Sequence, residues 1–262
     1  MAKRKDRGRP IVLAIAGWDP SSGAGITADI KTIAAHGCYG VTSITALTVQ
    51  STRGVKRVDA IEGRQITETL EELATDLEIS AVKIGMLGSA EAARSIAAFL
   101  KRHQPEIVVL DPIIRSSSGA DLVSKEAFQI LKGRILAQAT VITPNLSEAA
   151  ALTGMEVNNP VQMRAAASCL QHMGAKHVII TGGHLSSPVD LVFPCGGEPV
   201  FIEGEKITTN STHGTGCAFS TSVACSLAKG KSLLRAARLA KQFVEVALRK
   251  APRIGTGIGP VI

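Results

Sequence analysis

Short runs of consecutive apolar residues alternate along the chain with longer stretches whose apolar positions recur at helical spacing. Runs such as 11–16 and 107–110 are typical of strands that are buried on both faces, as in a parallel sheet. Longer stretches such as 90–102 have the spacing of helices with one buried face. The pattern predicts strands at 11–16, 41–49, 55–61, 81–84, 107–110, 141–142, 178–180, 191–193 and 200–202, and helices at 26–36, 66–77, 90–102, 124–136, from about 146, 161–173, 217–229 and 232–250.

Strands and helices alternate over the first two-thirds of the chain, which predicts an α/β fold with a mostly parallel central sheet and helices on both faces. The last two strands, after Pro188, are expected to be antiparallel. No repeat or linker interrupts the pattern, so we expect one domain, 11–262, after a basic and disordered tail, 1–10. Ligands of such sheets bind at the carboxyl ends of strands. The polar and glycine-rich segments fall at those ends, at 17–25, Gln50, 85–88, Asp111, Asn145 and 181–184.

Composition limits the choice of partner. Aromatic residues are only 3% of the chain, which argues against a stacking surface for single-stranded nucleic acid. The first nine residues supply +4 of the formal charge of +7, so the basic balance belongs partly to the tail and is weak support for nucleic-acid binding. No apolar run has the length of a membrane span or signal peptide, and the five cysteines have no zinc or disulfide spacing. We expect a cytoplasmic protein that binds neither nucleic acid nor membranes.

The stretch 210–217, Asn-Ser-Thr-His-Gly-Thr-Gly-Cys, lies directly before a predicted helix. A turn rich in glycine and hydroxyl residues at a helix start leaves backbone N–H groups unpaired, and with the positive end of the helix dipole these bind anions. The same field would stabilise a thiolate at Cys217 on the first turn. Taken alone, the pattern fits equally well a glycine-containing turn before a core helix, with Cys217 as a small buried residue.

The acidic residues that are candidates for chemistry are Asp19, Asp29, Asp111 and Glu148, and two of them stand at element ends where a metal could bind. Asp111 follows a predicted strand and precedes Pro112, where a carboxylate can hold Mg²⁺ or simply begin a turn. Asn145 and Glu148 stand three residues apart at a helix start, a spacing that suits a helix cap as well as a contact to a metal-bound water.

The segment 23–28 formally fits the dinucleotide fingerprint G-x-G-x-x-[GA]. The fingerprint requires its first glycine directly after the first strand and an acidic residue at the end of the second. Here six residues intervene, and the second strand ends in Gln50. We therefore expect no NAD site, and the sequence also has no Walker A lysine motif.

Thr212–Cys217 resembles the anion-hole motif of the phosphomethylpyrimidine kinases, a branch of the ribokinase superfamily that has Cys where most members have an Asp base. The resemblance extends along nearly the whole chain from residue 11. It implies a single-domain, ribokinase-like sandwich and an ATP- and Mg²⁺-dependent kinase of thiamine biosynthesis. Such a kinase phosphorylates hydroxymethylpyrimidine and then its monophosphate, and we expect a homodimer. The segments that carry the resemblance are 25–32, 45–55, 83–87, 111–112, 143–149, 212–217 and 257–261.

The resemblance also implies roles for individual residues. Backbone N–H groups of the glycine-rich turn would hold the transferring phosphoryl group, and Cys217 would accept the proton of the substrate. Gln50 would bind the pyrimidine edge, because its amide is both donor and acceptor, and Asp29 would either contact the substrate or support the site. The implied sets are Gly214, Thr215, Gly216 and Cys217 for catalysis; Gln50, Asp29, Met86 and Gly17 for the substrate; Asn145, Thr181 and His213 for ATP; and Asp111 and Glu148 for Mg²⁺.

Two positions depart from the family pattern. Trp18 stands where Ser is common, which would reshape the wall over the substrate. Thr181 stands where a phosphate-contacting Lys is common, so ATP affinity or the second phosphorylation could differ. Two alternatives remain open at this point. One is a pyridoxine or pyridoxal kinase of the same superfamily, and the other is a non-catalytic or NAD-binding α/β protein.

Overall fold

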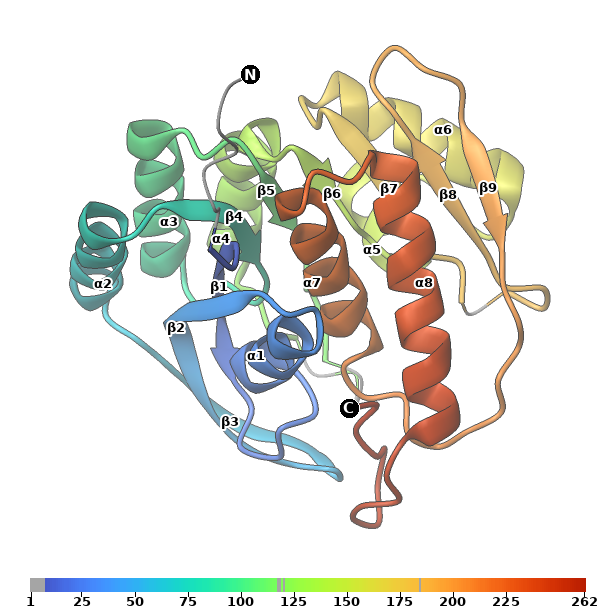
Figure 1. Cartoon of the computed structure of the whole chain (residues 1–262), viewed down its shortest axis with the longest axis horizontal. Coiled ribbons are helices and arrows are strands. Elements are labelled where there is room, and N and C mark those ends of the chain that lie inside the picture. Colours follow the sequence, from blue (N-terminus) through green and yellow to red (C-terminus); the bar gives the residue numbers. More distant parts are fainter. Residues whose placement is uncertain (1–7, 117–118, 120, 184) are drawn as a thin grey trace.

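The chain forms an α/β sandwich around one central sheet, as the alternating pattern predicts (Figure 1). The computed structural model describes residues 8–116, 119, 121–183 and 185–262. Most of the expected tail, 1–7, lies outside the described residues, so the division of the chain at residue 10 stays a prediction. The elements are β1 (Ile11–Trp18), α1 (Gly25–Ala35), β2 (Tyr39–Ser51), β3 (Gly54–Ala60), α2 (Gly63–Asp76), β4 (Ile79–Ile84), α3 (Ala90–His103), β5 (Val108–Leu110), α4 (Lys125–Ile130), β6 (Val141–Ile142), α5 (Leu146–Thr153), α6 (Pro160–His172), β7 (His177–Ile180), β8 (Val189–Phe193), β9 (Val200–Glu203), α7 (Thr215–Ala228) and α8 (Leu233–Lys250).

The described sheet has the strand order β3-β2-β1-β4-β5-β6-β7-β8-β9. The strands from β2 through β7 in this order are parallel, and β3, β8 and β9 pair antiparallel at the two edges. The prediction of a mostly parallel sheet with antiparallel strands after Pro188 is therefore confirmed.

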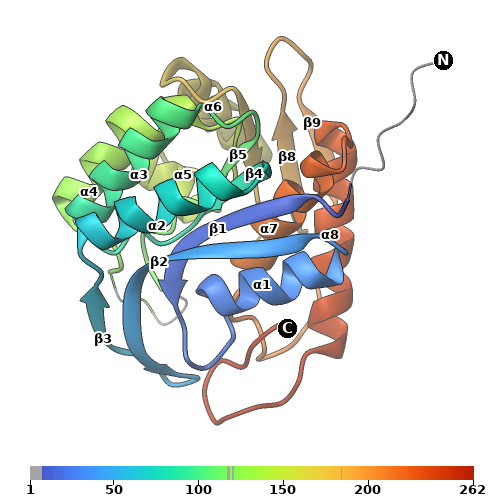
Figure 2. The same ribbon diagram turned by 60° about the vertical axis from the view of Figure 1, so that its left-hand side comes forward.

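Helices cover both faces of the sheet, and successive strand residues supply the two cores. Leu13 and Ile15 of β1 pack with α2 to α6 on one face, whereas Val12 and Ala14 pack with α1, α7 and α8 on the other (Figures 1 and 2). All four side chains have no exposed surface. A strand buried on both faces has a continuous apolar run, which is why the short runs were good predictors of these strands.

The expected helix 124–136 differs most from its prediction. Ser124 caps the start through its side chain, but only Lys125–Ile130 is α-helical, and the chain continues as a π-helical turn over Leu131–Ile135 and a 3₁₀ turn over Leu136–Gln138. Gly133 lies inside the π-helical turn, and glycine is a poor residue for the interior of an α-helix.

Strand register brings the polar segments together. Ile15 of β1 pairs with Ile84 of β4, Ile84 pairs with Leu110 of β5, and Leu110 pairs with Ile142 of β6. The residues that follow these positions therefore emerge at one edge of the sheet, as expected for ligand sites of parallel sheets.

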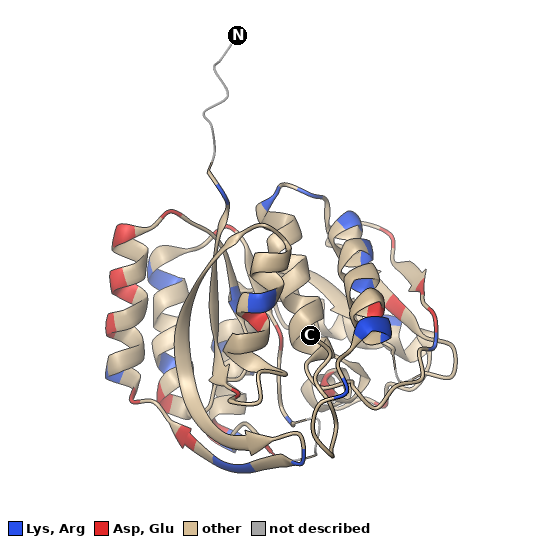
Figure 3. Ribbon diagram, turned by 60° about the horizontal axis from the view of Figure 1, so that its bottom comes forward, with Lys and Arg blue, Asp and Glu red and all other residues tan. Residues whose placement is uncertain are grey.

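Charge is distributed unevenly over the helices. Acidic residues predominate on α2 and basic residues on α8, at opposite sides of the view in Figure 3. Among the described residues no helix combines the length and the apolar character needed to cross a bilayer.

Candidate active site

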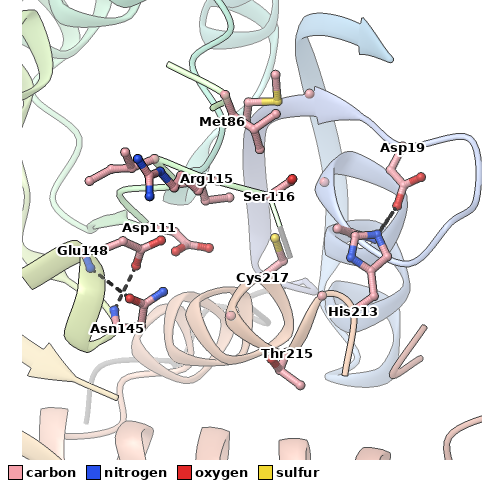
Figure 4. Close-up of a pocket in the computed structure, with 18 of the residues that line it drawn as sticks. Asp19, Met86, Asp111, Arg115, Ser116, Asn145, Glu148, His213, Thr215 and Cys217 are labelled. Atoms are coloured by element: carbon pink, nitrogen blue, oxygen red, sulfur yellow. Dashed lines mark hydrogen bonds and ion pairs between the residues drawn. The ribbon is translucent and has the colours of Figure 1, made fainter. Parts of the chain in front are cut away.

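A pocket of ≈ 670 Å³ lies at the carboxyl ends of the parallel strands, beside the start of α7 (Figure 4). Apart from Asp29, every site residue predicted from the sequence lines this pocket. These residues are Gly17, Gln50, Met86, Asp111, Asn145, Glu148, Thr181, His213, Gly214, Thr215, Gly216 and Cys217, and the two departures from the family pattern, Trp18 and Thr181, are also in the lining.

Asp29 does not line the pocket, contrary to its assignment to the substrate. Its side chain has no exposed surface and accepts hydrogen bonds from Lys83 Nζ at 3.0 Å and from Thr221 Oγ1 at 2.6 Å. Asp29 lies in α1, and these buried contacts agree with the second of its two expected roles, support of the site.

The start of α7 packs closely against the loop between β1 and α1, and Gly214 permits this close approach because it has no side chain. Gly214 has φ +86° and caps the helix, and a Cβ at this position would lie 1.7 Å from the carbonyl oxygen of Gly23. Gly216 faces open space, because a Cβ at this position would meet no neighbouring segment within 4 Å. The first turn of α7 thus presents backbone N–H groups to the pocket, an arrangement suited to an anion.

Cys217 lies on this first turn and is buried. Burial raises the pKa of its thiol to about 12, although the charge of Lys83 and a hydrogen bond from the Gly25 N–H act in the opposite direction. The place of Cys217 at a helix start does not by itself give a lowered pKa, because the removal of the thiol from water has the larger effect.

A buried cation lies beneath Cys217. Lys83 of β4 has no exposed surface, and its ammonium is 3.0 Å from both carboxylate oxygens of Asp29 and 3.8 Å from Asp111 Oδ2. Burial alone would lower the pKa of Lys83, but Asp29, Cys217 and Asp111 together hold it above its ordinary value. Lys83 therefore brings a fixed positive charge under the pocket floor.

Two carboxyl groups lie at the left of Figure 4. Asp111 follows β5 and accepts a hydrogen bond from Ser220 Oγ at 3.0 Å. Glu148 and Asn145 form a reciprocal capping box at the start of α5, with both bonds at 2.9 Å. Burial, followed by the charge of Asp111, raises the pKa of Glu148 to about 8, and burial also raises the pKa of Asp111. The cap interpretation of Asn145 and Glu148 is confirmed, and it places Glu148 beside Asp111.

The structure places His213 apart from Asn145 and Thr181, with which the sequence grouped it as an ATP contact. His213 Nε2 is 2.7 Å from Asp19 Oδ2 and 3.1 Å from Gln50 Nε2, at the opposite side of the close-up from Asn145 (Figure 4). His213 therefore belongs with the residues assigned to the substrate ring.

The comparisons with known proteins agree with this geometry. The family description for phosphomethylpyrimidine kinase matches residues 19–262. This chain belongs to the phosphomethylpyrimidine kinase family. The prediction of the family, of its fold and of a kinase is confirmed.

Relatives of two lengths share this kinase sequence. The hydroxymethylpyrimidine/phosphomethylpyrimidine kinase of Haemophilus influenzae is 41% identical over 95% of this chain and 94% of the relative. The thiamine biosynthesis bifunctional protein ThiED of Geobacter sulfurreducens is 39% identical over 97% of this chain, which spans only 52% of that relative.

Solved structures of two enzyme types share the fold. Phosphomethylpyrimidine kinase from Clostridium difficile has a TM-score of 0.81 and 34% identity, covering 92% of this chain and 100% of that one. Pyridoxal kinase from Staphylococcus aureus, in complex with AMP-PCP and pyridoxal, has a TM-score of 0.86 and 30% identity, covering 96% of this chain and 92% of that one.

Three residues at or beneath the pocket of this kinase were assigned no role from the sequence. Asp19 and Arg115 line the pocket, and Lys83 lies beneath it. A lysine inside an apolar strand run was a usable signal for Lys83, because a buried ammonium requires a carboxylate partner. The contacts of Asp19 and Arg115 depend on loop conformation, which the pattern of the chain does not give.

Proposed function

We propose that this kinase transfers the γ-phosphoryl group of ATP to the hydroxymethyl oxygen of 4-amino-5-hydroxymethyl-2-methylpyrimidine and then to the resulting monophosphate. The observation that carries the proposal is one pocket that joins an anion-binding helix start, a pair of carboxylates and a side chain able to pair with a pyrimidine edge. We further propose that the protein acts in the cytoplasm as a homodimer and binds no nucleic acid.

The start of α7 would meet the transferring phosphoryl group. Phosphoryl transfer depends on positioning and charge neutralisation more than on covalent chemistry by the enzyme. Backbone N–H groups of Gly214 to Cys217 would hold the developing charge, with Lys83 as a second positive charge beneath them. Asn145 and Thr181 would lie along the nucleotide, and the neutral hydroxyl of Thr181 would give it a hydrogen bond without a charge.

Asp111 and Glu148 fit a Mg²⁺ ion. Their carboxylate oxygens are hard ligands, and their mutual repulsion in a buried site is relieved by a cation. Mg²⁺ is commonly held in proteins by one or two carboxylates together with phosphates and water, so this pair of carboxylates is sufficient on the protein side. Such an ion would neutralise charge on the phosphates during transfer.

Cys217 would receive the proton that leaves the hydroxymethyl group. In the step, the substrate oxygen bonds to the γ-phosphorus, the bond from phosphorus to the leaving ADP oxygen breaks, and the proton passes to the Cys217 thiolate. Because burial holds Cys217 mainly as a thiol, its own proton has to pass to solvent water before the thiolate can act, and Lys83 and the Gly25 N–H favour that loss.

Pyridoxal is the second candidate substrate, because solved pyridoxal kinases share this fold. Turnover of both compounds at the same ATP and Mg²⁺ concentrations tests the choice. We expect a kcat/KM at least tenfold higher for hydroxymethylpyrimidine than for pyridoxal. A clear preference for pyridoxal would overturn the proposed substrate, and an absorbance change with NAD in place of ATP would revive the dinucleotide alternative.

A further inference from the structure

The side-chain amide of Gln50 lies between two groups that constrain its orientation. As placed, its nitrogen is 3.1 Å from His213 Nε2 and its oxygen is 3.2 Å from Thr48 Oγ1. The oxygen and nitrogen of an amide occupy interchangeable positions, so their hydrogen-bond partners decide between the two orientations. The orientation of the Gln50 amide therefore depends on whether each of these two neighbours donates or accepts a hydrogen bond.

Asp19 makes His213 a donor. The Asp19 carboxylate is buried and accepts hydrogen bonds from Ser21 N at 2.8 Å, Ser21 Oγ at 2.7 Å and Ala24 N at 2.9 Å, in addition to its contact with His213. Burial acts to raise the pKa of Asp19, but the hydrogen bonds from His213 and Ser21 outweigh it and lower the pKa below its ordinary value. An ionised carboxylate only accepts, so the 2.7 Å contact requires a proton on His213 Nε2.

Thr48 is an acceptor toward Gln50. Its hydroxyl has one proton and lies 3.0 Å from the carbonyl oxygen of Trp18, which can only accept. With that proton used on Trp18, the Thr48 oxygen has lone pairs to offer Gln50. The neighbour on one side of the amide thus donates, and the neighbour on the other side accepts.

We propose that Asp19 and His213 fix the orientation of the Gln50 amide, with the carbonyl oxygen toward His213 and the NH₂ group toward Thr48. In this orientation the His213 Nε2 proton lies near two acceptors, the Asp19 carboxylate and the Gln50 oxygen, while the Thr48 proton and the NH₂ proton that faces Thr48 each have one acceptor. The opposite orientation sets the NH₂ group against the N–H of His213 and makes the Thr48 proton serve two acceptors. His213 is then a positioning residue that determines specificity through Gln50.

The consequence for the ligand rests on the proposed function. An aminopyrimidine edge presents a ring nitrogen that accepts beside an amino group that donates. A Gln50 amide of fixed orientation matches that edge in one direction only, with the ring nitrogen on the Thr48 side and the amino group on the His213 side. The fixed order of donor and acceptor would set the orientation of the ring in the pocket, and with it the direction of the hydroxymethyl group.

A cycle of four variants tests the inference by kinetics. We expect His213→Leu to raise the KM for hydroxymethylpyrimidine about tenfold, since a fixed hydrogen-bonding arrangement is lost. His213→Gln, whose amide nitrogen can replace Nε2 as a donor, should recover most of that loss. In the Gln50→Ala background, His213→Leu should raise the KM by less than about twofold further, because its effect passes through Gln50.

Independent, multiplicative effects in the double variant would overturn the inference. A general disturbance of the α7 start would instead raise the KM for ATP and lower kcat in both His213 variants, and that result would also overturn it. Absence of turnover in the unmodified kinase would refute the proposed function rather than the inference.

A measurement without substrate tests the orientation of the Gln50 amide independently of the proposed function. In protein with ¹⁵N-labelled glutamine, assigned with Gln50→Ala, the NH₂ protons of Gln50 should show nuclear Overhauser effects to the Thr48 side chain. Effects to the ring protons of His213 in place of Thr48 would mean the opposite orientation and would overturn the inference, whatever the substrate.

Discussion

At the scale of single residues, Cys217 shows which part of a site a sequence can predict. Its place on the first turn of a helix follows from the glycine-rich turn and the apolar residues after it, and the structure confirms that place. The direction of its pKa shift does not follow, because it depends on tertiary packing: burial raises the pKa more than the charge of Lys83 and the hydrogen bond from the Gly25 N–H lower it. Local pattern gives position, whereas tertiary packing gives reactivity.

Replacing Cys217 by alanine tests the proposed base. We expect kcat to fall by about 10²- to 10⁴-fold, with little change in substrate binding, because a positioned proton acceptor is lost. Cys225→Ala is the matched control, since Cys225 is buried on the same helix but does not line the pocket. Near-normal kcat in Cys217→Ala would remove Cys217 from this role.

The raised pKa of Cys217 predicts that kcat/KM increases with pH. The active form is the thiolate, and with a pKa of about 12 its fraction grows about tenfold per pH unit across the neutral range. We expect kcat/KM to rise from pH 6 to pH 9 without a plateau, and the rise to be absent from the residual activity of Cys217→Ala. A profile that is flat, or that falls toward pH 9, in the unmodified kinase would contradict the thiolate mechanism.

At the scale of elements, the start of helix α5 contributes both to stability, through its capping box, and to the site, through Glu148. The spacing of Asn145 and Glu148 identified a helix start, but it left a cap and a metal contact as alternatives. The structure has the capping box, and because Asp111 emerges from the neighbouring β5 the same Glu148 also faces a second carboxyl group. The start of a helix can be predicted from the sequence, whereas the residues that lie beside it across the sheet can be predicted only once the strand order is known.

Two variants of helix caps separate the effect of Asn145 on stability from its effect on the proposed Mg²⁺ site. Asn145→Ala and Asn159→Ala each remove a side chain that accepts a backbone N–H at a helix start, so each should lower stability by about 1 kcal/mol. Only Asn145→Ala should also raise the Mg²⁺ concentration needed for half-maximal activity, because α6 contributes nothing to the pocket lining. Urea unfolding and Mg²⁺ titration measure the two quantities, and equal Mg²⁺ requirements in both variants would contradict the assignment of Glu148.

At the scale of the whole molecule, the strand order brings segments that are far apart in the sequence together around one pocket. The parallel sheet and its two helical layers were predictable, because buried strands and amphipathic helices have distinct patterns. The pairing of Lys83 with Asp29 was not predictable, since it joins β4 to α1 across 54 positions of sequence, and the apolar run around Lys83 indicates burial without naming the partner. Because of this pairing, the structure favours the supporting role of Asp29 over the substrate contact, a choice that the sequence left open.

Lys83→Met tests the contribution of this pair to stability. The substitution would leave Asp29 and Asp111 buried without their cation, and we expect a loss of about 3–5 kcal/mol in the free energy of unfolding. Arg64→Met, which removes the exposed ion pair with Glu68, should leave the urea midpoint unchanged. A Lys83→Met protein as stable as the Arg64 variant would show that the buried charges have no structural role.

Phosphate-product analysis shows whether this kinase phosphorylates hydroxymethylpyrimidine and then its monophosphate. The purified kinase is incubated with ATP, Mg²⁺ and hydroxymethylpyrimidine, and the products are separated and identified by mass over time. We predict that the monophosphate appears first and the diphosphate follows, with one ADP formed for each phosphoryl group transferred. ATP that stays intact, or hydroxymethylpyrimidine recovered without phosphate while pyridoxal is phosphorylated under the same conditions, would contradict the proposed reaction.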